Sequence, residues 1–324
     1  MTIREIVKQR IMVLDGAMGT MIQPYGLEET DFRGYRFSKV PGMMKGNNDM
    51  LCITRPDVVK DIHCKYLAVG ADMITTNTFS SQRISQADYH LEEFSREMAL
   101  QGARIARECA DEFSTPDKPR FVCGSVGPTN KTCSMSPDVS NPAYRDLDYD
   151  TLYDAYLEQM DALIEGGVDA ILIETIFDTL NCKAAIDAAV EAMNSRGVDL
   201  PIMLSVTVSD LAGRTLSGQT LDAFLASVSS YPIFSVGLNC SFGVTDSLVG
   251  LVERLAAEVD LPLVVYPSAG MPDASGRYGL APERFAEVMC RVAAVDGVKI
   301  VGGCCGTTPR HIAALSKAMK RHEA

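Results

Sequence analysis

Eight short runs of mostly apolar residues recur along the chain, and a longer stretch with helical spacing separates each run from the next. The runs span residues 11–15, 72–77, 121–126, 170–175, 202–208, 235–239, 261–267 and 299–303. They are nearly continuously apolar rather than alternating, which is typical of parallel strands that are covered on both faces. The pattern therefore predicts a repeated strand and helix unit with parallel strands.

Glycines mark the joints where a predicted helix ends just before the next strand. These glycines are Gly70, Gly167, Gly197 and Gly297. Glycine is favoured there because it adopts the left-handed backbone that closes a helix. Eight such units, with no GxGxxG turn after the first strand, predict an α/β fold of the (β/α)8 TIM-barrel class. A chain of 324 residues fits one such barrel, so we expect a single domain over residues 1–324.

Two connections are much longer than an ordinary loop between a strand and a helix. They span residues 16–55 after the first strand and about 127–149 after the third. Both should emerge at the carboxyl ends of the strands, where barrel enzymes carry their active sites. We interpret them as walls or lids over a pocket.

Charge and hydropathy exclude two classes of partner. The formal net charge is −12, whereas nucleic-acid binding depends on Lys and Arg neutralising phosphates. No stretch approaches the roughly 18 uninterrupted apolar residues of a membrane-spanning helix. The 10 cysteines are spread along the chain without the density of a secreted disulfide scaffold. We therefore expect a soluble cytoplasmic protein with reduced thiols and neither nucleic acid nor membrane as a partner.

The residues that end the predicted strands should face one another around the mouth of the barrel. They are Asp15, Asn77, Ser125, Glu174, Ser209, Asn239, Cys240, Ser268, Cys304 and Cys305. Three of them are thiols, in the segments GLNCSFG (237–243) and VGGCCGTTPRH (301–311), where glycines let the backbone approach closely. Three thiols can occupy three corners of a tetrahedral zinc site and leave the fourth open, as in catalytic sites. The spacing alone equally allows a vicinal disulfide or packing cysteines.

An open zinc site with three thiolate ligands suits a particular chemistry. The thiolates outweigh the charge of the metal, so the site is a poor generator of hydroxide. A soft, electron-rich zinc favours a substrate thiol as its fourth ligand, which it deprotonates while leaving it nucleophilic. The arrangement therefore predicts alkylation of a thiol.

Two carboxylates and a glycine turn could bind the rest of the substrate. Asp15 and Glu174 lie at predicted strand ends and could hold an ammonium group, although Asp15 could equally cap its own turn. The amides of Gly16 and Ala17 in the DGAMGT turn could receive a carboxylate. Together these groups fit an amino acid that carries a thiol.

Long segments of the chain resemble the homocysteine-binding domain of cobalamin-dependent methionine synthase. The segments GLNC (237–240) and VGGCCGTTPRHI (301–312) are shared with the wider homocysteine S-methyltransferase superfamily. Four further segments favour the cobalamin-dependent branch: DFRGYRF (31–37), KGNND (45–49), VGPTNKT (126–132) and GRTLSGQT (213–220). The resemblance also includes VLDGAMGTMIQ (13–23), TTNTF (75–79), SPDVSNPAYR (136–145) and ILIETIFDTLN (171–181), and it extends over essentially the whole chain.

The resemblance implies a zinc-bearing barrel in which homocysteine thiolate attacks methylcobalamin, itself methylated from methyltetrahydrofolate, to give methionine. By matching position, the zinc ligands would be Cys240, Cys304 and Cys305. Asp15 and Glu174 would engage the amino group of homocysteine, with the amides from Gly16 and Ala17 near its carboxylate. Cobalamin-binding and folate-binding domains or proteins would be the partners.

The sequence departs from this family at two points. The seventh strand ends in YPSAG (266–270), where relatives commonly carry Asn in place of Ser268. A chain of 324 residues also has no room for the folate, cobalamin and activation domains. Two alternatives follow: a stand-alone homocysteine S-methyltransferase that uses S-methylmethionine or betaine, and a non-catalytic module that binds zinc or thiols.

Overall fold

All eight predicted strands are present in the computed structural model and pair in parallel in one sheet. They are β1 (Met12–Val13), β2 (Met73–Thr75), β3 (Phe121–Val126), β4 (Ala170–Ile176), β5 (Ile202–Val206), β6 (Ser235–Cys240), β7 (Leu263–Pro267) and β8 (Val298–Val301). Their order in the sheet is β1-β8-β7-β6-β5-β4-β3-β2. The structure describes residues 1–322 except 211, 242 and 275, so Phe242 of the GLNCSFG segment and residues 323–324 lie outside the described residues.

The two ends of the sheet come together and close a barrel. Leu14, just after β1, forms a parallel bridge with Met73 of β2. Two backbone hydrogen bonds join the same segments, from Asp72 N to Val13 O at 2.7 Å and from Asp15 N to Met73 O at 3.0 Å. The predicted (β/α)8 class is therefore confirmed.

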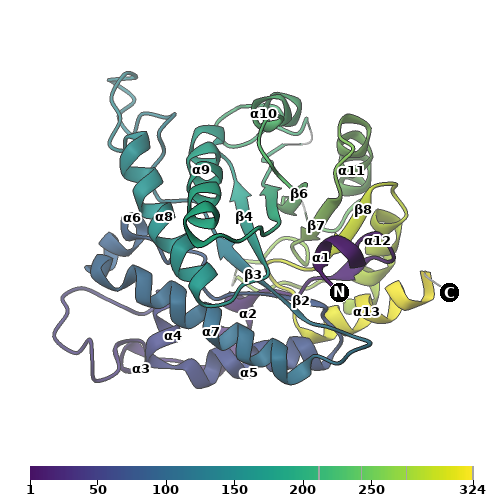
Figure 1. The fold of residues 1–324 in the computed structure, drawn as a ribbon, viewed down its shortest axis with the longest axis horizontal. Coiled ribbons are helices and arrows are strands. Elements are labelled where there is room, and N and C mark those ends of the chain that lie inside the picture. Colours follow the sequence, from purple (N-terminus) through teal and green to yellow (C-terminus); the bar gives the residue numbers. More distant parts are fainter. Residues whose placement is uncertain (211, 242, 275, 323–324) are drawn as a thin grey trace.

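A long helix follows each strand and packs on the outside of the barrel (Figure 1). These helices are α5 (Pro56–Ala68), α7 (Ser95–Phe113), α8 (Tyr149–Glu165), α9 (Thr179–Arg196), α10 (Leu221–Val228), α11 (Asp246–Glu258), α12 (Pro282–Ala293) and α13 (Pro309–His322). Local sequence sets their ends. Asp178 caps α9 by accepting from Leu180 N and Asn181 N, and Gly197 ends it in the left-handed conformation.

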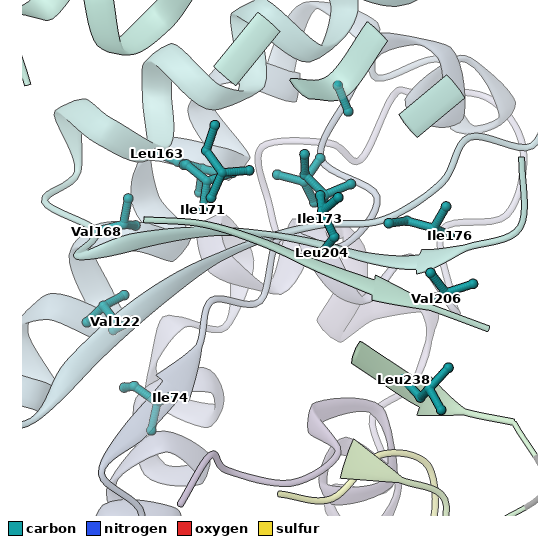
Figure 2. Packing of buried hydrophobic residues seen from close by; sticks show 14 of the residues in the cluster. Ile74, Val122, Leu163, Val168, Ile171, Ile173, Ile176, Leu204, Val206 and Leu238 are labelled. Carbon is teal, nitrogen blue, oxygen red and sulfur yellow. The ribbon is translucent and has the colours of Figure 1, made fainter. Parts of the chain in front are cut away.

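The sheet separates two buried layers of apolar side chains. The outer layer lies between strands and helices, and Figure 2 shows part of it, with Ile171 and Ile173 of β4 and Leu204 of β5. The inner layer fills the barrel with the side chains of alternate strand positions: Met12, Leu14, Met73, Phe121, Cys123, Ala170, Leu172, Met203, Val264, Tyr266 and Ile300. The short helix α1 (Ile3–Ile6) packs against this inner layer, ahead of the start of β1.

The long connections emerge where they were expected, but the first is more structured than a loop. It contains the short helices α2 (Met18–Ile22), α3 (Glu29–Arg33) and α4 (Leu51–Thr54), with the 3-10 turns η1 (Gln23–Tyr25) and η2 (Asn48–Met50). The connection after β2 adds α6 (Arg83–Gln86), η3 (Ala87–Tyr89) and η4 (Glu92–Phe94). Among the described residues, no helix combines the length and the apolar character needed to cross a membrane.

Candidate metal and substrate site

A cavity of about 650 Å³ opens at the carboxyl ends of the strands. Seven of the predicted strand-end residues line it: Asp15, Asn77, Ser125, Glu174, Cys240, Cys304 and Cys305. The other three are placed differently. Ser209 donates a hydrogen bond to Arg214 O within the loop after β5, Asn239 is buried behind the cavity wall, and Ser268 lies against Cys240.

The three cysteines that were predicted as metal ligands form one cluster. The Sγ atom of Cys240 lies 2.8 Å from that of Cys304 and 3.9 Å from that of Cys305, and the Cys304 and Cys305 sulfurs are 4.0 Å apart. With zinc–sulfur bonds of about 2.3 Å, two thiolates of a tetrahedral site lie about 3.8 Å apart. Two of the three separations match this value closely, so the cluster fits a tetrahedral metal ion after a small outward shift of one sulfur.

Tight backbone turns present these thiols to the cavity. Cys240 and Ser241 adopt left-handed φ angles of 52° and 48°, an uncommon conformation outside glycine that recurs at functional sites. Hydrogen bonds from Cys304 N to Pro267 O at 2.9 Å and from Ser268 N to Cys240 O at 3.4 Å tie the turns after β6, β7 and β8 together. The ligand positions are thus set by backbone contacts between three strand ends.

The cluster does not carry three negative charges by itself. Hydrogen bonds from the Cys240 and Cys304 thiols lower the pKa of Cys305 to about 3. Hydrogen bonding to Cys240 and Cys305, together with burial, raises the pKa of Cys304 well above its ordinary value. The shared hydrogen bonds therefore drive the pKa values of Cys304 and Cys305 apart. Ionising all three thiols requires a cation among them, which is the behaviour of a metal site.

Two buried carboxylates face the same cavity. Asp15 is 3% exposed and accepts hydrogen bonds from Thr75 N at 2.9 Å and Thr75 Oγ1 at 3.1 Å. Glu174 accepts from Tyr266 Oη at 3.0 Å and from Ser125 Oγ. Burial raises the pKa of both carboxyl groups, and the charge of Glu174 adds to the rise at Asp15. No Lys or Arg is among the described residues that line the cavity, so no side chain there offsets the repulsion between the two carboxylates. A bound ammonium group would supply the missing positive charge.

The DGAMGT turn (residues 15–20) lies beside the turn that carries Cys304 and Cys305, which we call the cysteine turn. Hydrogen bonds tie the two turns together. Gly16 and Ala17 line the cavity, and Ala17 N donates to Thr307 Oγ1 at 3.1 Å. Tyr66 Oη bridges the turns by hydrogen bonding to Ala17 O at 3.1 Å and Thr307 O at 3.2 Å. A Cβ atom at Gly16 would lie 2.7 Å from Thr307 Oγ1, so the packing requires glycine there. The Ala17 amide already has a partner, whereas it was expected to be available to a substrate carboxylate.

Three polar side chains that support the site were not predicted from the sequence. Tyr266 hydrogen-bonds to Glu174, and the Tyr278 hydroxyl lies near the Cys305 sulfur. Asn239 accepts from Thr175 N at 3.0 Å and Ser205 Oγ at 2.8 Å and donates to Thr175 Oγ1 at 2.8 Å. The position of Asn239 before Cys240 was a usable signal, because a buried amide at a strand end needs partners. No sequence signal marks Tyr278.

Solved structures of known enzymes share this fold. The metallated form of the homocysteine methyltransferase MmuM from Escherichia coli has a TM-score of 0.74 and 23% identity, covering 97% of this chain and 98% of that one. Its oxidized form has a TM-score of 0.73 and 23% identity, with 96% of each chain covered. A B12-independent methionine synthase from Shewanella sp. W3-18-1, solved with selenomethionine, has a TM-score of 0.52 and 13% identity, covering 87% and 91%.

The match to a protein family extends over almost the whole barrel. The family described as homocysteine S-methyltransferase matches residues 12–319, from β1 to within α13. This range contains the three clustered cysteines and both buried carboxylates. The chain is therefore a methyltransferase and belongs to the homocysteine S-methyltransferase family.

Proposed function

We propose that this chain methylates the thiol of homocysteine with the help of a zinc ion held by Cys240, Cys304 and Cys305. The observation that carries the proposal is the joint placement of two groups in one cavity. The ligand sulfurs of the three cysteines all lie within 4.8 Å of one another, and the buried carboxylates of Asp15 and Glu174 line the same cavity. This arrangement offers a thiol site at one end and an ammonium site at the other.

The cluster has the composition that zinc activation of a thiol requires. A zinc ion at three thiolates would lower the pKa of a substrate thiol and keep the resulting thiolate nucleophilic. The metallated form of the Escherichia coli homocysteine methyltransferase shows that a protein with this fold takes up metal. Zinc is our assignment for the present chain because the ligand set is entirely sulfur and has an open fourth corner.

The remaining contacts would orient the amino acid. Glu174 is fixed by Ser125 and Tyr266, and Asp15 is fixed by Thr75, so neither carboxylate has to reorganise when an ammonium group binds. We assign the substrate carboxylate to the amides around Gly16 and Ala17, with Gly16 as the main candidate because Ala17 N already donates to Thr307. Bound in this way, homocysteine would extend its thiol toward the three cysteines.

The charge of the cavity restricts the methyl donor. Its lining includes four carboxyl residues, Asp15, Asp49, Asp88 and Glu174, and no Lys or Arg among the described residues. A folate with its glutamate carboxylates is therefore a poor direct occupant. A methyl group carried on cobalamin by another domain or protein fits, as the KGNND and GPTNKT segments suggest. A small donor whose methyl group is carried on a positively charged sulfonium or quaternary ammonium centre, such as S-methylmethionine or betaine, fits equally well.

The metal and the donor can be tested with one protein preparation. We expect one zinc per chain, with homocysteine adding one sulfur ligand in X-ray absorption spectra. Methionine formation is then measured with free methylcobalamin, S-methylmethionine or betaine as the donor. Cys304→Ala should lose both zinc and turnover. The proposal would fail if this variant retained zinc and activity, or if homocysteine left the metal ligands unchanged. The donor that gives turnover decides between a methyl group carried on cobalamin and a small methyl donor.

A further inference from the structure

The described residues of the connection from β7 to α12, 268–274 and 276–281, lie against the cysteine turn, and we call them the β7 strap. Its first residues are held by Ala269 N, which donates to Cys305 O at 2.8 Å. Its last residues are held by His311, whose Nε2 is 2.9 Å from Leu280 O while its Nδ1 accepts from Thr308 N at 3.2 Å. The strap is therefore anchored at both ends to the segment that carries Cys304 and Cys305.

Tyr278 lies between these two anchors and contacts the cysteine turn directly. A Cβ atom built on Gly306 would lie 2.1 Å from Tyr278 Cγ, so the ring rests on the bare Cα of the residue that follows Cys305. Gly306 also has a left-handed φ of 79°, and its amide donates to Thr20 Oγ1 at 2.9 Å, which fixes the surface that receives the ring. This packing brings the phenol of Tyr278 close to the Cys305 sulfur, within the reach of a hydrogen bond.

We propose that Tyr278 is a positioning residue that donates a hydrogen bond to the Cys305 thiolate and thereby tunes the metal site. The inference rests on the proposed function, because it takes Cys305 as a metal ligand. It adds a residue from outside the strand ends, on a loop in which no metal ligand or substrate contact is proposed.

Two physical properties suit Tyr278 to this role. A hydrogen bond to a metal thiolate removes electron density from the sulfur and holds its orientation, and such outer-shell partners set ligand strength. A phenol has an ordinary pKa of about 10, so Tyr278 carries its proton at neutral pH and can act as the donor. In contrast to Ser268, which lies against Cys240 just after β7, Tyr278 approaches Cys305 from the far part of the strap.

The test replaces only the hydroxyl. Tyr278→Phe keeps the ring on Gly306 and removes the donor, and the full chain is loaded with Co²⁺ as a spectroscopic probe. We expect the sulfur-to-cobalt charge-transfer band to move to longer wavelength, because the Cys305 thiolate becomes more electron-rich. Metal affinity, measured by competition with a chelator, should fall about tenfold, with one Co²⁺ per chain still bound at saturation. Tyr35→Phe, at a tyrosine that is 97% exposed, is the matched control and should change neither quantity.

A second variant separates the hydrogen bond from the packing. Gly306→Ala should push the ring away while keeping the hydroxyl, so it should reproduce the spectral shift in any folded protein. An unchanged band in folded Tyr278→Phe would overturn the inference, since a merely structural tyrosine leaves the thiolate as it was. If wild-type protein bound no Co²⁺ through thiolates, the proposed function itself would fail, and the inference with it.

Discussion

At the scale of single residues, the cavity holds ionisable groups in positions that favour binding over stability. Asp15 and Glu174 are both nearly excluded from solvent, and no cation lies among the described lining residues. Burying a carboxylate without a positive partner is costly, and hydrogen bonds from Thr75, Ser125 and Tyr266 offset only part of this cost. A protein with such a site commonly becomes more stable when the buried functional side chain is replaced.

Asp15→Asn should show this exchange of stability for binding. The pKa of Asp15 is raised in the folded chain, mainly by burial, so its stabilising contribution is present at pH below the unfolded value and is lost as pH rises through the folded value. We therefore expect urea unfolding to show a more stable variant at pH 8 but not at pH 4. The KM for homocysteine should rise roughly 10-fold to 100-fold, as for a lost hydrogen bond to a charged group.

The same measurement on Asp154→Asn controls for a general charge effect, because Asp154 is exposed on α8. A variant of Asp15 that is less stable than wild type at pH 8, or that keeps its KM, would contradict the assignment of Asp15 as an ammonium ligand.

Asn239 belongs to the same scale, because one side chain joins the ends of β4, β5 and β6. It holds Thr175, a β-branched residue with a left-handed φ of 59°, next to Glu174. Asn239→Ala would remove the hydrogen-bond partner of Thr175 N and one partner of Ser205 Oγ in the interior. We expect a loss of at least about 2 kcal/mol in the free energy of unfolding and a higher KM for homocysteine. Asn194→Ala, at an exposed position on α9, should leave both unchanged.

At the scale of elements, the strands were predictable because burial on both faces leaves a strong apolar signal. The predicted run 121–126 coincides with β3, whereas 11–15 shortens to β1 (Met12–Val13), because Leu14 makes only an isolated bridge and Asp15 turns into the cavity. The helices of the first connection were not predicted, since α2, α3 and α4 contain only four or five residues each. Helices so short depend on tertiary contacts rather than on propensity.

Gly237 shows how closely two of these elements approach. A Cβ atom at this position of β6 would lie 1.7 Å from Val264 O of β7. Gly237→Ala must therefore push the two strands apart, and we expect a loss of about 3 kcal/mol or more in urea unfolding, at the upper end of overpacking effects. Gly250→Ala on α11 meets nothing within 4 Å and should instead stabilise the protein by about 1 kcal/mol. Equal effects of the two substitutions would refute this account of the GLNC segment.

At the scale of the whole molecule, barrel closure made the main site predictable. Cys240 is 64 residues away from Cys304 in the chain, yet a barrel places the ends of β6 and β8 on one rim with only β7 between them. The clustering of the three thiols follows from that topology. Tyr278 could not be found in this way, because its position depends on the path of the β7 strap and not on the register of the strands.

The same topology couples metal binding to the stability of the barrel. One sulfur comes from the last residue of β6 and two come from the turn after β8, so the cluster exists only when the barrel is folded. A ligand that binds only the folded state at a hundred times its Kd adds about 2.7 kcal/mol to stability. For a chain of this length, that corresponds to a rise of roughly 4 °C in Tm, from the average unfolding entropy per residue.

Calorimetry with zinc at a hundred times its Kd should show this rise in Tm and a further one with homocysteine. Replacing Cys240, Cys304 and Cys305 together by Ser should abolish both, whereas Cys290→Ser, on the outer helix α12, should retain them. A zinc-induced rise that survived the triple substitution would place the metal elsewhere on the chain.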